Sequence, residues 1–209
     1  MAPSNPGTTR PRTRAARRLV QLYAGLAAYG LSAALMVRSN LGVMPWDVLH
    51  QGLAVHLGAD MGVVSIVAGA FVLLAWIPLR ERIGLGTISN VLVIGSTLDL
   101  ALLALPADLN LPVRLGCAAA GIVLNGLATA AYIGVDFGPG PRDGLMTGLS
   151  RRTGRSLRAV RTCLEVAVVV AGWLLGGTLG FATIGYALSI GPLTQAFLPR
   201  LRVLRAPAP

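Results

Sequence analysis

The chain lacks lysine and has few charged residues of any kind. Charged residues make up 12% of its 209 residues, and all 18 basic residues are arginine. Without lysine the chain can form neither a Schiff base nor the phosphate-binding loop that contains Gly-Lys, and a Gly-x-Ser-x-Gly nucleophile motif is also absent. It has two cysteines and two histidines, and His50 and His56 do not have the spacing of a zinc-protease motif. The sequence therefore predicts no enzyme, no metal site and no cofactor.

Apolar segments dominate the rest of the chain. Hydrophobic residues make up 54% of it, and six segments approach the roughly 20 residues that a helix needs to cross about 30 Å of hydrocarbon. These segments are 18–38, 61–79, 84–105, 112–134, 159–177 and 180–198. Helices are expected because a spanning segment must satisfy its own backbone hydrogen bonds. The chain is predicted to be an all-α membrane protein with six transmembrane helices in the lipid bilayer, a disordered tail at 1–17 and a second tail at 200–209.

The arginines predict the orientation of these spans. A net charge of +10 can indicate nucleic-acid binding or membrane topology. Sixteen of the 18 arginines lie before or at the start of span one, after span two, between span four and the start of span five, or after span six, and only Arg38 and Arg114 lie on the other side. Cytoplasmic loops of membrane proteins are rich in arginine, so both termini are predicted to be cytoplasmic. Topology explains these arginines, and we expect no nucleic-acid partner.

The chain repeats itself. The stretch GVMPWDVLHQGL at 42–53 returns at 138–149 as GPGPRDGLMTGL, displaced by 96 residues (141 − 45 = 96), and 17 of the 55 positions that pair 41–95 with 137–191 are identical. The halves are 18–105 and 112–199, with three spans each. Because three is odd, the second half must enter the membrane from the opposite side, as in the inverted repeats of secondary transporters. The predicted fold is therefore two inverted three-helix repeats.

Each copy of the motif predicts a short helix after the first span of its half. Pro45 and Pro141 suit a first helical position, and Asp47 and Asp143 follow where a negative charge favours the helix N-terminus. About three turns are too short to span a membrane, so each helix either lies in the interface or re-enters the membrane beside a cavity. An ordinary capped loop and a paired gate or binding element are both open interpretations.

Other polar residues of the spans are candidates for substrate contact. Thr87 and Thr183 open spans three and six, where they either cap a hairpin or direct a helix N-terminus at an anionic ligand. Asn90 either hydrogen-bonds between helices or contacts a ligand. His50 follows Asp47 by three residues and can form a pH-sensitive pair with it.

Two acidic residues within spans are candidates for coupling to a proton gradient. Charged groups inside a membrane are costly and default to functional hypotheses. Asp99 lies in span three and Glu165 in span five. A structural ion pair is the alternative for Glu165, because Arg161 lies four residues earlier.

The same segments resemble a family. The runs LGVMPWDVLHQGL, GLGTISNVLVIG with Asp99, GPGPRDGLMTGLSRRTG with Arg158 and Glu165, and IGPLTQAFLP resemble the YczE/YyaS/YitT-type bacterial membrane proteins, and most of all the YczE branch, over about residues 18–199. The resemblance implies a small multi-pass protein of the bacterial inner membrane, loosely grouped with transporters and proposed antibiotic exporters. It supplies no family substrate or catalytic residue.

The leading hypothesis is a small secondary transporter or exporter of a small organic molecule, with proton coupling as part of the hypothesis. Six helices make a thin wall around any cavity, so we expect a homodimer. The alternative is a membrane partner that scaffolds or regulates another membrane or biosynthetic enzyme without transporting anything. The substrate is not apparent from the sequence.

Overall fold

The structure is a computed structural model that describes residues 11–203. Within these residues all regular secondary structure is helical, in eight helices. They are α1 (Pro11–Ser39), α2 (Pro45–Leu57), α3 (Met61–Leu79), α4 (Leu85–Ala104), α5 (Leu111–Ile133), α6 (Pro141–Thr153), α7 (Leu157–Leu174) and α8 (Phe181–Leu201). The all-α prediction is confirmed.

Five of these helices are long and apolar enough to cross a membrane: α1, α3, α4, α5 and α8. Their bounds agree with five of the predicted spans to within a few residues, apart from the N-terminal extension of α1. The segment predicted as a sixth span, 159–177, is helical as α7 but is not among the five. The 18 residues of α7 include Arg158, Arg161 and Glu165, and these charges are unfavourable in hydrocarbon.

Both predicted tails are shorter than expected. Helix α1 begins at Pro11, so 11–17 is helical where a disordered segment was predicted. Proline suits a helix start and arginine is a good helix former, which explains this error. At the other end α8 continues to Leu201, and the Val203 backbone N–H donates to the Gly134 carbonyl (3.0 Å). Residues 1–10 and 204–209 of the predicted tails lie outside the described residues.

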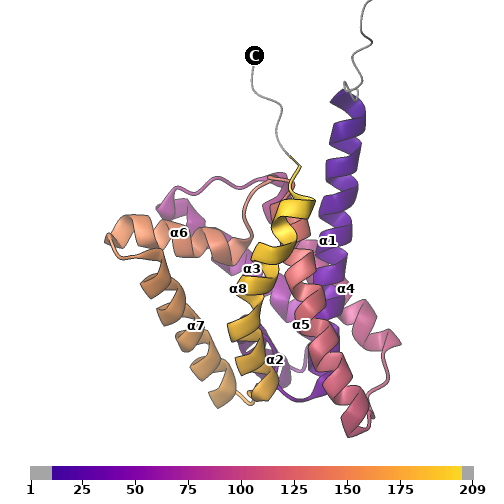
Figure 1. Cartoon of the computed structure of the whole chain (residues 1–209). Coiled ribbons are helices and arrows are strands. Elements are labelled where there is room, and N and C mark those ends of the chain that lie inside the picture. The colour runs from indigo at the N-terminus through magenta and orange to yellow at the C-terminus, as the bar shows by residue number, and fades with distance from the viewer. Residues whose placement is uncertain (1–10, 204–209) are drawn as a thin grey trace, which may run out of the picture.

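The two Pro-x-Asp motifs begin helices of equal length, as predicted. Helices α2 and α6 each have 13 residues with proline in the first turn, and both end at a glycine in the left-handed conformation, Gly58 (φ 61°) and Gly154 (φ 67°). Glycine adopts this conformation at little cost, which stops each helix. Figure 1 places α6 toward the end of the bundle where α1 begins and α8 ends, and α2 toward the opposite end.

Helices α1 and α5 form the centre of the bundle, with α4 packed on α1 and α8 on α5. Glycines permit the central crossing. A Cβ at Gly25 would lie 3.3 Å from the Ala128 carbonyl oxygen, and a Cβ at Gly121 would lie 3.0 Å from the Ser32 carbonyl oxygen. The remaining helices form an outer group in which α2 packs on α7 and α3 packs on α6.

Backbone contacts between the halves occur in pairs. The Gly86 N–H donates to the Phe137 carbonyl (2.9 Å), and the Ala182 N–H donates to the Leu41 carbonyl (3.0 Å). The donors are 96 residues apart (182 − 86 = 96), and so are the acceptors (137 − 41 = 96). Each half thus binds the linker that precedes the motif helix of the other half.

Two arginines repeat this pattern. Arg18 Nε donates to the Val135 carbonyl (3.0 Å), and Arg114 Nε donates to the Ser39 carbonyl (2.6 Å). The arginines and their acceptors are again 96 residues apart (114 − 18 = 96; 135 − 39 = 96). Both arginines join the first helix of one half to the end of the first helix of the other.

The packing of the outer helices does not recur 96 residues later in the chain. Helix α3 packs along α4, whereas α7, its counterpart in the second half, has no comparable packing on α8. Figure 1 shows α7 leaning outward from α8. At the α3–α4 contact a Cβ on Gly95 would lie 2.6 Å from the Gly62 carbonyl oxygen, while the equivalent Gly191 has open space around it.

Candidate functional site

A cavity of about 80 Å³ lies between the two motif helices. Its wall includes Trp46, Asp47 and His50 of α2 and Pro141 and Arg142 of α6, with the remaining residues from α1, α3, α4, α5 and the α6 linker. Since about 15 Å³ holds one water, the cavity has room for several waters or a small organic group. The two copies of the motif therefore contribute to one site.

Asp47 is buried at this wall with half of its carboxylate unpaired. Its residue exposure is 9%, and its Oδ1 lies 3.2 Å from His50 Nδ1. The Asp47 Oδ2 atom has no hydrogen-bond partner among the described residues, and neither does the neighbouring Trp46 Nε1. The expected Asp47–His50 pair is present. An unpaired buried polar atom costs about 1–3 kcal/mol, so the site retains unmet hydrogen-bonding capacity.

Arg142 supplies a cation at the opposite wall. Its Nη2 donates to the Tyr29 hydroxyl (2.5 Å), and the guanidinium carbon lies 5.7 Å from the centre of the Tyr29 ring. Burial lowers the pKa of the Arg142 guanidinium, but the neighbouring Tyr29, Tyr186 and Asp143 outweigh this effect, so the pKa of Arg142 is raised above its ordinary value. Arg142 is thus a permanent positive charge at the cavity.

The second motif carboxylate lies outside the cavity wall. Asp143 Oδ2 accepts a hydrogen bond from the Tyr132 hydroxyl (3.0 Å). Tyr132 itself does line the cavity and meets Tyr29 edge to face, with ring centres 6.4 Å apart. The mirrored aspartates therefore have different surroundings: one faces the cavity with a free oxygen, and the other is bound by a tyrosine.

A series of hydrogen bonds between buried polar groups ends at Tyr29, one of the residues that line the cavity. The Tyr186 hydroxyl donates to Asn125 Oδ1 (3.0 Å), Asn125 Nδ2 donates to Ser32 Oγ (2.8 Å), and Ser32 Oγ donates to the Tyr29 carbonyl (2.6 Å). These bonds link α8, α5 and α1. They fix the backbone of Tyr29, whose hydroxyl accepts the hydrogen bond from Arg142.

The candidate threonines hold linkers and do not line the cavity. Thr87 Oγ1 accepts from the Gly84 N–H (3.2 Å) and donates to the Pro139 carbonyl (2.8 Å). Thr183 Oγ1 accepts from the Gly180 N–H (3.4 Å). Both threonines thus act as helix caps, and Thr87 also binds the linker of the other half.

The remaining substrate candidates divide in the same way. Asn90 and Pro141 line the cavity, whereas Pro45 does not. Of the eight substrate or gate candidates, the structure therefore gathers Asp47, His50, Asn90 and Pro141 around one space.

The two coupling candidates lie apart from the cavity and have structural partners. Asp99 accepts hydrogen bonds from the N–H groups of Gly62 (2.7 Å) and Val63 (3.1 Å), so it caps the N-terminus of α3. Glu165 forms an ion pair with Arg161 (2.9 Å) on the exposed side of α7. The structural alternative for Glu165 is therefore present.

Comparison with known proteins identifies the family of this chain. The family of unknown function DUF6198 matches residues 16–199. The chain belongs to this family. An uncharacterised protein of Haemophilus influenzae is 41% identical over 173 residues, which cover 83% of this chain and 79% of the relative. The uncharacterised membrane protein YczE of Bacillus subtilis is 31% identical over 180 residues, which cover 85% of this chain and 84% of the relative.

A third relative is also similar to this chain. The uncharacterised protein YyaS of Bacillus subtilis is 27% identical over 180 residues, which cover 84% of this chain and 89% of the relative. The resemblance to YczE- and YyaS-type proteins is therefore confirmed, and the chain is a multi-pass membrane protein of this type. No solved structure matches the chain.

Arg142 is the main cavity residue that the sequence did not indicate as a site residue. It was counted only as one of the arginines that indicate topology. A signal was present, because a cation in the first turn of a helix opposes the helix dipole, and Arg142 stands between Pro141 and Asp143. Tyr29 gave no comparable signal, since only tertiary packing brings it to Arg142.

Proposed function

We propose that this protein is a small secondary transporter or exporter of a small organic molecule, with its substrate site in the cavity between α2 and α6. The observation that carries the proposal is the pair of opposite charges, Asp47 on α2 and Arg142 on α6, that line one cavity. Each comes from a different copy of the motif. Inverted-repeat transporters bind their substrates between the two repeats, beside helix ends that face the site.

The paired contacts between the halves support the inverted repeat on which this proposal depends. A two-fold relation requires that a contact between positions i and j recur with the roles of the halves exchanged. The Gly86–Phe137 and Ala182–Leu41 hydrogen bonds have this relation, and so do the bonds of Arg18 and Arg114. In this proposal α7 is the sixth span, and α3 and α7 are equivalent.

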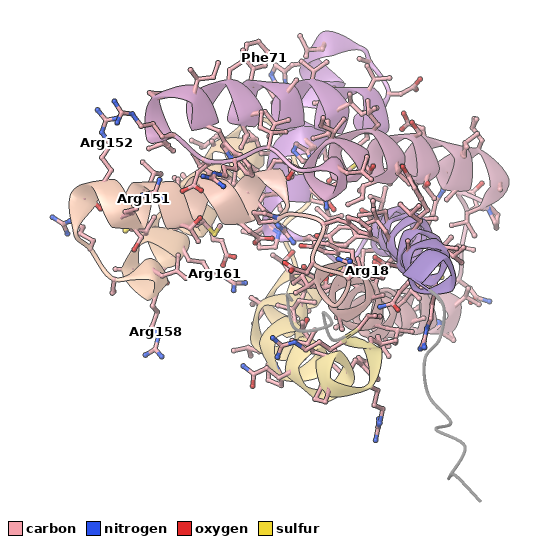
Figure 2. All side chains as sticks on the ribbon, turned by 90° about the horizontal axis from the view of Figure 1, so that it is seen from above. Arg18, Phe71, Arg151, Arg152, Arg158 and Arg161 are labelled. Atoms are coloured by element: carbon pink, nitrogen blue, oxygen red, sulfur yellow. The ribbon has the colours of Figure 1, made fainter. Side chains whose placement is uncertain are left out.

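The arginine distribution supports an inner-membrane protein with both termini cytoplasmic. Figure 2 views the molecule from the end where α1 begins and shows the side chain of Arg158 pointing outward from α7. Basic side chains gather on the cytoplasmic side of membrane proteins. This orientation and the homodimer remain predictions.

The unequal packing of α3 and α7 supports alternating access. Helices α3 and α4 are tightly packed, whereas α7 and α8 are separated. This corresponds to a transporter whose cavity is closed toward one side of the membrane and less tightly closed toward the other. Exchange of these two arrangements between the halves would open the cavity to each side in turn. A scaffold or regulator of another enzyme, which is the alternative, has no need of such an exchange.

Two-sided labelling tests the proposal without knowledge of the substrate. Ser65, in α3, lines the cavity. Ser65→Cys is placed in a chain whose free cysteines, Cys117 and Cys163, are replaced by alanine. An impermeant thiol reagent is then applied to right-side-out and to inside-out vesicles.

A transporter predicts that Ser65→Cys reacts from both sides. Exposed loop positions serve as controls: Ala107→Cys and Arg155→Cys should each react from one side only, and from opposite sides. Reaction of Ser65→Cys from one side only, or from neither, would contradict transport and favour the scaffold alternative.

A further inference from the structure

The charges at the cavity are opposite in sign but do not pair with each other. Among the side chains that the structure describes, in residues 15–203, ion pairs within 4.0 Å include those of Asp47 with His50, Arg151 with Glu81 and Arg161 with Glu165. Arg142 takes part in none of them. The cavity therefore has an anionic wall on α2 and a cationic wall on α6, each without a countercharge from the other.

Both walls also retain hydrogen-bonding capacity. Asp47 Oδ2 is a buried acceptor without a partner, and Trp46 Nε1 is a buried donor without one. The Arg142 guanidinium has five N–H donors, and its partners are the hydroxyls of Tyr29 and Tyr186. Buried polar groups normally have partners, so these groups indicate a ligand with both a donor and an acceptor.

We propose that the substrate is a small zwitterion that carries an ammonium group and a carboxylate. This inference rests on the proposed transport function and names its substrate class. The ammonium group donates to Asp47, and the carboxylate accepts from Arg142, which can bind carboxylates through two parallel hydrogen bonds. Val72, Val91 and Ile94 line the rest of the cavity and accommodate a small apolar side chain.

A ligand with a single charge fits less well. An organic anion that meets Arg142 also meets the carboxylate of Asp47, and an organic cation that meets Asp47 also meets the guanidinium. In a low-dielectric cavity a like charge is strongly unfavourable. His50 contacts only Oδ1 of Asp47, so it leaves Oδ2 for the ammonium group.

The test compares zwitterions with their singly charged analogues on the purified full-length protein in lipid nanodiscs. The probes are L-alanine and L-leucine, the acids that lack the amine (propionate and 4-methylpentanoate) and the amines that lack the carboxylate (ethylamine and 3-methylbutylamine). Calorimetry and thermal shift measure binding. We expect at least one amino acid to bind ten times more tightly than either of its analogues.

Variants locate this binding. Asp47→Asn and Arg142→Gln should each weaken amino-acid binding at least tenfold, whereas Glu165→Gln, which removes an acidic group of α7 outside the cavity wall, should not. Because the comparison of probes uses the wild-type chain, it remains decisive if a variant fails to fold.

Three results would overturn the zwitterion assignment. They are equal binding of an acid or amine analogue, amino-acid binding that Asp47→Asn and Arg142→Gln leave unchanged, and no binding of any probe. The two-sided reaction of Ser65→Cys is measured without a ligand, so it separates failure of this assignment from failure of the transport proposal.

Discussion

The two halves of the chain share a motif and an order of helices, but their outer helices pack differently. In the first half, Gly62 and Gly95 let the backbones of α3 and α4 approach closely. The positions 96 residues later are Arg158 and Gly191, and there α7 and α8 are not packed together. Glycine at a helix contact permits close approach in membranes, whereas an arginine at the same place prevents it.

The two halves therefore agree around the central helices and differ in the outer ones. Hydrogen bonds around the central helices recur at positions 96 residues apart in the two halves. The packing of the outer helices does not recur. In the proposed mechanism the symmetric centre stays fixed, and the asymmetric outer helices exchange their arrangements. The following substitutions at mirrored positions test this division.

The largest difference is expected between Gly95→Ala and Gly191→Ala. A Cβ at Gly95 would lie 2.6 Å from the Gly62 carbonyl oxygen, whereas Gly191 has open space. Gly95→Ala should lower the free energy of unfolding by about 1–3 kcal/mol through overpacking, and Gly191→Ala should not lower it. Denaturant unfolding in detergent measures both. Equal losses would show that α7–α8 packing resembles α3–α4 packing in solution.

A smaller difference is expected between the two arginines of the centre. Arg18→Gln and Arg114→Gln each remove charged hydrogen bonds to carbonyls, worth about 1.5 kcal/mol. Arg18 also lies 4.5 Å above the Phe137 ring, while the mirrored residue is Leu41. A cation–π contact adds about 0.5–1 kcal/mol at an exposed site. Arg18→Gln should therefore have the lower melting temperature, and the reverse order would count against this account.

The capping threonines should differ by about 1 kcal/mol. Thr87 Oγ1 donates to Pro139 of the other half, but no such bond of Thr183 is present among the described residues. A typical hydrogen bond contributes about 0.5–1.5 kcal/mol, so Thr87→Val should destabilise more than Thr183→Val. Hydrogen exchange at the linker before α6 provides a second readout. Unchanged protection there in Thr87→Val would exclude this role.

The smallest effect is expected at Glu165. Its ion pair with Arg161 lies on an exposed surface, and such helix pairs contribute about 0.3–0.5 kcal/mol. Glu165→Gln should therefore change the melting temperature little and leave the two-sided reaction of Ser65→Cys intact. If it abolished reaction from one side, Glu165 would regain its place as a coupling residue.

Local chemistry made much of the fold predictable. Pro45 and Pro141 mark helix starts because proline fits the first turn of a helix, and both motif helices begin there. The long apolar runs predicted six spans, and five of them are helices that are long and apolar enough to cross a membrane. The Asp47–His50 pair followed from a spacing of three residues, which places two side chains on one helix face.

Tertiary packing decided what the sequence could not show. Nothing local predicts that Arg142 crosses to Tyr29, 113 residues earlier in the chain. Asp99 looked like a buried charge without a partner, but its partners are backbone N–H groups, which no sequence pattern displays. The apolar run at 159–177 gave no indication that α7 would separate from α8.

The exchange of outer-helix arrangements is tested most directly by distances between mirrored helix pairs. Val67 of α3 and Leu92 of α4 are exposed, and their equivalents are Cys163 and Leu188, also exposed. The first labelled protein carries Val67→Cys and Leu92→Cys in a chain without its native cysteines. The second carries labels at the native Cys163 and at Leu188→Cys, with Cys117 replaced by alanine. Double electron–electron resonance is recorded in nanodiscs. Alternating access predicts a mostly short distance for the first pair and a mostly long distance for the second. Each pair should also show a minor population of the opposite kind, and both minor populations should rise when ligand is added. A single, ligand-independent distance for both pairs would contradict it.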